Sequence, residues 1–306
     1  MTSNRRSVLL IGGSGFVSGA LALACVRAGH DTWAVTRGKR PVPKGVSLLH
    51  ADRYDSSAFR QAIEQADRHW DLAVDSIAYD PADVRQDLAV LGPRVDHFVL
   101  ISTDFVYDPS CRTFPQAIDN PCLQDDTYGG KKRRCELELA GSAGPMTWTV
   151  FRPCHIYGPG SLLGCLPDHG RDPDLLDHLR ANRPLRLVDG GRFLQQPIFA
   201  DDLAKLVLSA MDNPKAVGQI YPAAGPDIIE SHRFYRIIAD VIGTDLHVEE
   251  LPIGDYLREH PDRAPFFCHR IYDLAPLTSA GLIAPATPIV DGLVEHVRSL
   301  LQAEDP

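Results

Sequence analysis

Three short motifs follow one another in a fixed order and carry residue types that could act on a carbinol or a ketone. They are Gly12-Gly13-Ser14-Gly15-Phe16-Val17-Ser18-Gly19, Ser102-Thr103-Asp104-Phe105-Val106-Tyr107 and Tyr128-Gly129-Gly130-Lys131-Lys132. The first could cradle a dinucleotide, and the other two could place a hydroxyl, a phenol and an ammonium beside its nicotinamide. Together they predict an oxidoreductase active site.

The four-residue spacing of Tyr128 and Lys132 would place both side chains on one face of a helix. An ammonium close to a phenol favours the phenolate and lowers its pKa from about 10. The tyrosine could then exchange a proton with a carbinol near neutral pH, and Thr103 could offer a hydroxyl to the same oxygen. The same spacing also occurs on ordinary helix surfaces, so the prediction depends on the neighbouring motifs.

The glycine motif lies between an apolar run at 8–11 and a helical segment predicted at 20–28. Glycines at such a turn let the backbone approach a pyrophosphate, whose charge is met by the amides and dipole of the following helix. Ser18 stands where a third glycine would allow close helix packing, and serine is small enough to replace it.

Basic residues follow the second predicted strand, where an acid often binds the ribose hydroxyls of NAD. The chain has Arg37-Gly38-Lys39-Arg40 there, which favours NADP(H), although NAD stays open and these charges are also typical of a solvated loop. Asp52-Arg53 follows the third strand and is either a wall for the adenine or an ordinary surface pair.

The elements that must position these motifs alternate along the first half of the chain. Strands are predicted at 8–11, 32–36, 46–50, 72–75, 98–102 and 147–151, with further helices at 58–66, 83–91 and 132–139. This alternation is typical of a doubly wound parallel sheet, so we expect a Rossmann-type α/β domain over 1–155. A smaller α/β substrate-binding domain is expected over 156–306, with segments such as 196–212 returning to the first domain. Its helices are predicted at 175–181, 203–211, 232–242 and 289–302.

The composition excludes several classes of protein. The chain has 306 residues, of which 44% are hydrophobic, and a formal net charge of −9, which argues against nucleic-acid and membrane-surface partners. Its seven cysteines contain no Cys-x-x-Cys pair, so we expect no metal site, no disulfide framework and a reducing cytoplasm. The apolar run at 8–11 is too short for a signal peptide or a membrane span.

The motifs together resemble the extended short-chain dehydrogenase/reductase superfamily, within it the NAD-dependent epimerase/dehydratase group that modifies nucleotide sugars. The resemblance continues through Arg152-Pro-Cys-His-Ile-Tyr-Gly-Pro-Gly160 and Gln196-Pro-Ile-Phe-Ala-Asp-Asp202. It implies that Tyr128 is the catalytic acid/base, that Lys132 is its activator and a ribose ligand, and that Thr103 is the second hydroxyl. It also implies a homodimer.

Three departures from this group bear on reaction and substrate. Phe105 stands where its dehydratases have a glutamate, which argues against dehydration. Asp104 before an aromatic residue resembles 4-keto-sugar reductases and some epimerases, although it could equally be a hydrogen-bonding residue at a strand end. His155 replaces an asparagine, and Gln195-Gln196-Pro197 replaces an Arg-Asp-Phe run whose arginine serves a diphosphate, so both argue against an ordinary nucleotide sugar.

The predicted function is therefore an NAD(P)-dependent sugar or nucleotide-sugar modifying enzyme. A 4-epimerase acting through a transient ketone is preferred, an NADPH-dependent keto-sugar reductase is the alternative, and a non-catalytic cofactor- or RNA-binding homologue is a third class. The predicted catalytic residues are Thr103, Asp104, Tyr128 and Lys132. The predicted substrate residues are Thr103, Asp104, Tyr128, His155, Gln196, Arg192 and Arg270. The predicted cofactor residues are Gly12, Ser14, Gly15, Phe16, Val17, Arg37, Asp52, Arg53, Ala78, Ser102, Tyr128, Lys132, Pro153 and His155.

Overall fold

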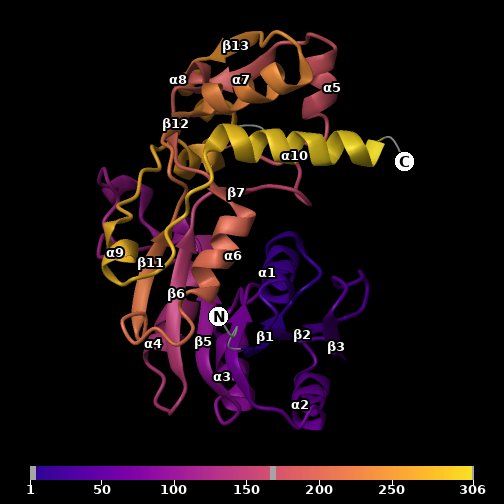
Figure 1. The fold of residues 1–306 in the computed structure, drawn as a ribbon. Helices are drawn as coiled ribbons and strands as arrows, with labels where there is room; N and C mark the ends of the chain where they lie inside the picture. The colour runs from indigo at the N-terminus through magenta and orange to yellow at the C-terminus, as the bar shows by residue number, and fades with distance from the viewer. Residues whose placement is uncertain (1–4, 166–169, 305–306) are drawn as a thin grey trace.

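A seven-stranded parallel sheet forms the centre of the molecule (Figure 1). The structure is a computed structural model and describes residues 5–165 and 170–304. The strand order is β11-β6-β5-β4-β1-β2-β3. The bounds are Ser7–Ile11 (β1), Asp31–Thr36 (β2), Val46–His50 (β3), Trp70–Asp75 (β4), Val95–Ile101 (β5), Thr147–Pro153 (β6) and Gln219–Ala223 (β11). The predicted doubly wound α/β fold is confirmed.

Helices cover both faces of this sheet, because the inner strands are apolar on both sides. One core contains Leu21 and Leu203, and the other contains Phe59, Leu91 and Leu139. The helices of the first face are Phe16–Arg27 (α1) and Ala200–Leu208 (α6). Those of the second are Ser56–Gln65 (α2), Pro81–Leu91 (α3) and Tyr128–Ala140 (α4).

Five helices (α1, α2, α3, α4 and α6) begin two or more residues before their predicted starts, and three of these starts (α2, α3 and α4) have a side-chain cap. Helix α4 begins at Tyr128 because the Thr127 hydroxyl accepts a hydrogen bond from the Gly130 amide at 3.3 Å. The Asp55 carboxylate caps α2 in the same way. Strand β11 was not predicted, because Pro222 is typical of a strand break, but an edge strand tolerates proline.

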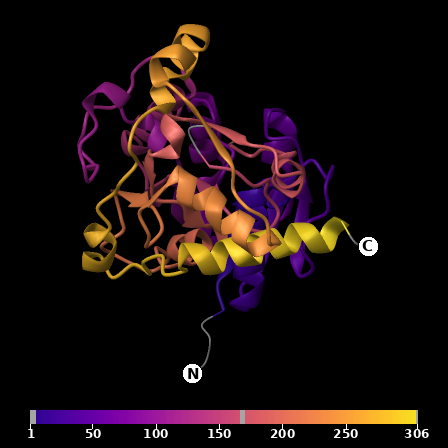
Figure 2. The same cartoon turned by 90° about the horizontal axis from the view of Figure 1, so that it is seen from above.

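The rest of the chain forms a smaller region beyond the carboxyl ends of β5 and β6 (Figures 1 and 2). Its core lies between α7 and α10, which lie side by side. Its helices are Leu175–Arg180 (α5), Ser231–Ile242 (α7), Ile253–Glu259 (α8) and Ile289–Glu304 (α10), whereas Ala275–Ser279 (α9) packs through Leu277 into the core of the sheet's first face. Its short strands are Ile156–Tyr157 (β7), Leu185–Val188 (β8), Leu194–Gln195 (β9), Ile198–Phe199 (β10), Ile229–Glu230 (β12) and Val248–Leu251 (β13). Single 3-10 turns lie at Asp104–Val106 (η1), Pro109–Cys111 (η2), Asp189–Gly191 (η3) and Pro261–Phe266 (η4).

The chain crosses back to the sheet after it has entered this region. Helix α6 packs against α1, and β11 pairs with β6. Because the strands are parallel, the residues that follow β1, β4, β5 and β6 meet at one edge of the sheet, which faces the smaller region. Over residues 5–165 and 170–304, no helix is long and apolar enough to cross a membrane.

Candidate active site

The glycine motif turns tightly between β1 and α1, and the turn depends on missing side chains. Gly13 has a φ of 110°, and a Cβ there would lie 2.6 Å from the Cβ of Ala34 on β2. A Cβ on Gly12 would lie 3.2 Å from the Cβ of Ser18, so the bare Gly12 makes room for the serine. The Ser18 hydroxyl in turn accepts a hydrogen bond from the Gly15 amide at 3.1 Å.

A cavity of about 220 Å³ opens beside this turn and suits the adenosine half of a dinucleotide. Gly12, Ser14 and Gly15 line it from the glycine motif, and Arg37 and Asp52 line it from the neighbouring strand ends. Lys39, Arg40 and Tyr54 lie on the same lining. Backbone amides at a helix start together with cations fit a pyrophosphate and a phosphorylated ribose. Phe16 lines a different cavity, of about 670 Å³, which also includes Ser14, Gly15 and Arg40.

A second cavity, of about 410 Å³, gathers most of the predicted reactive residues. They come from the start of α1, the end of β5, the start of α4 and the end of β6. The predicted residues in its lining are Val17, Ser102, Thr103, Asp104, Tyr128, Lys132, Pro153 and His155. A phenol, a hydroxyl and an ammonium thus share one cavity next to the cofactor cradle.

The side chain of Tyr128 is half-exposed, and we expect its phenol to keep the proton at neutral pH. Burial raises its pKa to about 12, although a hydrogen bond with Thr103 acts in the opposite direction. Lys132 was expected to lower the pKa of Tyr128, but it is not among the main groups that shift this pKa. The Lys132 ammonium is only 1% exposed and donates to the carbonyl oxygens of Ala78 at 2.8 Å and Ile101 at 2.7 Å, while burial lowers its own pKa.

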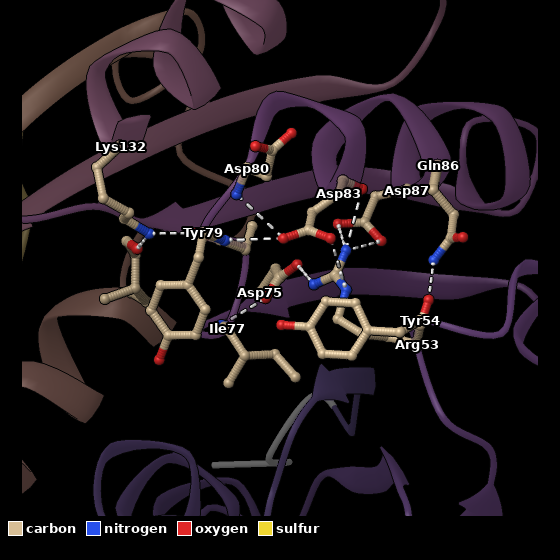
Figure 3. A network of polar contacts seen from close by, with 12 residues as sticks. Arg53, Tyr54, Asp75, Ile77, Tyr79, Asp80, Asp83, Gln86, Asp87 and Lys132 are labelled. Atoms are coloured by element: carbon tan, nitrogen blue, oxygen red, sulfur yellow. Dashed lines mark hydrogen bonds and ion pairs between the residues drawn. The ribbon is translucent and has the colours of Figure 1, made fainter. Parts of the chain in front are cut away.

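Arg53 belongs to the lining of the cavity of about 220 Å³, but its guanidinium is bound by carboxylates. It is buried, with 4% of the residue exposed, and pairs with Asp75, Asp83 and Asp87 (Figure 3). Asp87 is fully buried, and burial followed by repulsion from Asp75 raises its pKa well above the ordinary range.

This Arg53 cluster fixes the loop between β4 and α3 (Figure 3). The Asp75 carboxylate accepts from the Ile77 amide at 2.6 Å, and Asp83 accepts from the Tyr79 amide at 2.9 Å. Lys132 holds the carbonyl of Ala78 between them. The ring of Tyr79 then lies 6.3 Å from that of Tyr128, centre to centre, and lines both cavities.

Asp104 lies in the lining of the reactive cavity, where it is held by residues from the smaller region. Its Oδ2 pairs with Arg270 and accepts from the Tyr272 hydroxyl at 2.5 Å, and a guanidinium nitrogen of Arg112 lies 3.5 Å away. These cations keep the pKa of Asp104 below its ordinary value despite its burial.

Three predicted substrate residues lie outside the lining of this cavity. Arg270 is completely buried behind Asp104. Gln196 is also buried and holds the Gly225 carbonyl at 2.9 Å. Arg192 pairs with Glu250 at 2.9 Å and with Asp189 at the molecular surface.

Sequence reasoning missed several residues of the lining, among them Ser76, Tyr79, Arg171 and Phe266. Tyr79 could have been found, because it follows a strand whose carboxyl end meets the site. Phe266 comes from η4, far along the chain, and no local pattern marks it.

His155 is neutral in the folded protein, because burial followed by repulsion from Arg171 lowers its pKa to about 4. In the unfolded chain the imidazole is protonated below about pH 6.5, whereas in the folded protein it stays neutral down to about pH 4. The stability tied to this group is therefore present above pH 6.5 and is lost as the pH falls towards 4. His155→Gln should flatten the decline in thermal midpoint between pH 7.5 and 4, whereas His247→Gln, at an exposed position, should not. An unchanged decline in the His155 variant would contradict the assignment.

The fold and the site together define a dinucleotide-binding α/β enzyme architecture. The model of the NAD dependent epimerase/dehydratase family matches residues 8–224, and the chain belongs to this family.

Relatives agree with the fold at low sequence identity. An epimerase from Methanothermobacter thermautotrophicus aligns with a TM-score of 0.82 at 15% identity, covering 99% of this chain and 94% of that one. The UDP-glucose 4-epimerase of Thermotoga maritima, solved with UDP-glucose, gives a TM-score of 0.78 at 15% identity, covering 97% and 99%.

One relative is named for stem-loop binding and not for epimerisation. The chloroplast stem-loop binding protein of 41 kDa b from Arabidopsis thaliana is 25% identical over 240 residues, which are 73% of this chain. The match spans 60% of the length of that relative.

Proposed function

We propose that this protein is an NAD(P)-dependent enzyme that epimerises a sugar at C4 through a transient ketone, with Tyr128 as its acid/base. The observation that carries the proposal is the reactive cavity, in which Thr103, Tyr128 and Lys132 lie beside the glycine motif. The family supports the same class of chemistry. We also propose that the protein is a cytoplasmic homodimer and that its substrate is a sugar or a nucleotide sugar.

The residues of the cavity divide the work. Tyr128 would take the proton from the carbinol oxygen and later return it, and Thr103 would orient the same oxygen. Lys132 and Ser102 would hold the ribose and nicotinamide side of the cofactor, and the glycine motif its pyrophosphate. Ala78 is buried outside both cavity linings and would act only through its bond with Lys132. A nicotinamide dinucleotide bound there would take up and return the hydride, and its oxidised form would bring a positive charge close to the phenol.

A keto-sugar reductase is the second candidate, and two observations favour it. The protonated phenol of Tyr128, with its raised pKa, is suited to donate a proton to a ketone. The basic residues Arg37, Lys39 and Arg40 suit the 2′-phosphate of NADPH. Incubation of the purified protein with paired 4-epimers separates the two. Interconversion without added reductant supports the epimerase, and strict dependence on added NADPH supports the reductase.

The basic lining predicts the choice of cofactor. The double variant Arg37→Ser and Arg40→Ser should weaken NADP(H) binding about tenfold or more, because each substitution removes a guanidinium that could make a charge-assisted hydrogen bond to the 2′-phosphate. NAD(H) binding should change little. Titration calorimetry with both cofactors measures the effect, and Lys44→Ser, on the same loop but outside the lining, is the control. Equal losses for NAD(H) and NADP(H) would contradict this role.

A non-catalytic, RNA-binding role is the third candidate, because of the name of the Arabidopsis relative. The run Lys131 to Arg134 offers little support for it. Lys132 is buried, Arg133 pairs with Glu136, and Arg134 pairs with Asp126. Binding of a stem-loop RNA without any binding of NAD(H) or NADP(H) would favour this role over the enzyme.

A further inference from the structure

Four aromatic rings line the reactive cavity as a continuous series, which we call the aromatic wall. Tyr79 lies 6.3 Å from Tyr128, Tyr128 lies 6.2 Å from Phe105, and Phe105 lies 5.4 Å from Phe266, measured between ring centres. All four belong to the lining of the cavity. The wall therefore leads from the acid/base at Tyr128 to the smaller region, where a substrate would extend.

Arg270, which lies behind this wall, already forms an ion pair with Asp104. Arg270 pairs with Asp104, both are almost completely buried, and the Arg270 guanidinium carbon lies 4.5 Å from the centre of the Phe105 ring. Its Nε and Nη2 have no hydrogen-bond partner among the described residues, but they are inaccessible and the residue is absent from the cavity lining. An anion could reach Arg270 only by displacing Asp104, which would leave a buried carboxylate unpaired.

The lining offers an anion little else. Among its described residues the cations are Lys132, which is held by two carbonyl oxygens, and Arg171, which lies over the ring of Phe16 at 5.9 Å. Phe16 begins the helix that follows the glycine motif, so Arg171 lies on the cofactor side. Asp104 brings a negative charge to the lining. Its contacts with Arg270, Arg112 and Tyr272 all use Oδ2, so Oδ1 can accept a hydroxyl.

We infer that the substrate is an uncharged carbohydrate, bound with one face of its ring on the aromatic wall and a hydroxyl on Asp104, and not a nucleoside diphosphate sugar. The inference rests on the proposed function and names its substrate class. Aromatic faces suit the C–H face of a sugar, and a lining carboxylate attracts hydroxyl donors and repels phosphate.

Matched pairs of probes test the inference by binding. The full chain, saturated with NAD or NADP, is titrated calorimetrically with glucose, galactose and N-acetylglucosamine and with the UDP conjugate of each. We expect at least one free sugar to bind, with its UDP conjugate no tighter and UDP alone not bound. A UDP conjugate that binds tenfold tighter than its free sugar, or the absence of binding by all three free sugars, would overturn the inference.

Variants of the wall add a second readout. Phe105→Leu and Phe266→Leu should each weaken binding of the free sugar about tenfold, while the dissociation constant of the cofactor stays within twofold of wild type. Phe267→Leu is the matched control, because its ring packs on Phe193 and Tyr256 instead. Asp104→Asn should also weaken binding of the free sugar, because a neutral amide oxygen is a weaker acceptor for a sugar hydroxyl than a carboxylate. Sugar binding unaffected in both wall variants would contradict the inference.

The two proposals fail in different ways. Turnover of a tightly bound UDP-sugar would preserve the proposed function and remove the inference. Binding of a free sugar with no change in the cofactor or the sugar would preserve the inference about the binding site and remove the epimerase.

Discussion

Replacing Tyr128 with phenylalanine should lower kcat by about 10² to 10⁴-fold, the usual contribution of a positioned acid or base. The substitution removes only the phenol oxygen, which shares a hydrogen bond with Thr103. The ring contacts with Phe105 and Tyr79 would remain, so the dissociation constant of the cofactor should stay near the wild-type value. Steady-state kinetics and cofactor titration on the same preparation measure the two effects.

Tyr79→Phe is the control for this experiment, because Tyr79 is another partly exposed tyrosine on the same lining. If Tyr79 only forms part of the wall, this variant should retain most of kcat. Full activity in the Tyr128 variant, or an equal loss in the Tyr79 variant, would refute the assignment of Tyr128 as the acid/base.

Arg53→Met should lower the free energy of unfolding by about 3 to 5 kcal/mol, the usual cost of leaving buried charges without their partner. Arg53 is the cation shared by Asp75, Asp83 and Asp87, and the methionine would leave their carboxyl groups without a counter-charge. Denaturant unfolding of the whole chain measures the change.

Two further variants separate this cause from a general loss of arginine. Arg60→Met removes an exposed pair with Glu64 and should cost less than about 1 kcal/mol. Asp87→Asn should also be mild, because the amide oxygen still accepts from the Arg53 guanidinium and Asp75 and Asp83 remain as its charged partners. The account would be contradicted if Arg53→Met lowered the free energy of unfolding by less than about 1 kcal/mol, or if Asp87→Asn lowered it as much as Arg53→Met does.

The sheet could be predicted from local patterns, because each inner strand is a short apolar run and each helix follows at the expected distance. Strand β11 and the short strands of the smaller region could not, because their pairing depends on partners far along the chain. The early start of α4 depends on the Thr127 cap, a local signal that the apolar periodicity does not contain.

The candidate site divides in the same way. Thr103, Tyr128 and Lys132 could be found because each sits in a short motif at an element boundary. The pairing of Asp104 with Arg270 joins positions 166 residues apart, and the burial of Arg53 depends on carboxylates from β4 and α3. Such charge pairs have no periodic signature, so sequence reasoning could place Arg270 only at the substrate, and Arg53 only at the adenine or in a surface pair.

The hydrogen bonds of the β4–α3 loop determine that it loses its conformational entropy during folding and not during cofactor binding. Asp75 and Asp83 bind its amides and Lys132 binds its Ala78 carbonyl, and since these partners belong to the chain itself, the loop loses its conformational freedom when the chain folds. A cofactor that meets this loop has no ordering penalty to overcome there, and more of its contact energy is expressed as affinity. The Arg53 cluster and Lys132 would thus preorganise the proposed cofactor site, and in this cluster three carboxyl groups share one guanidinium.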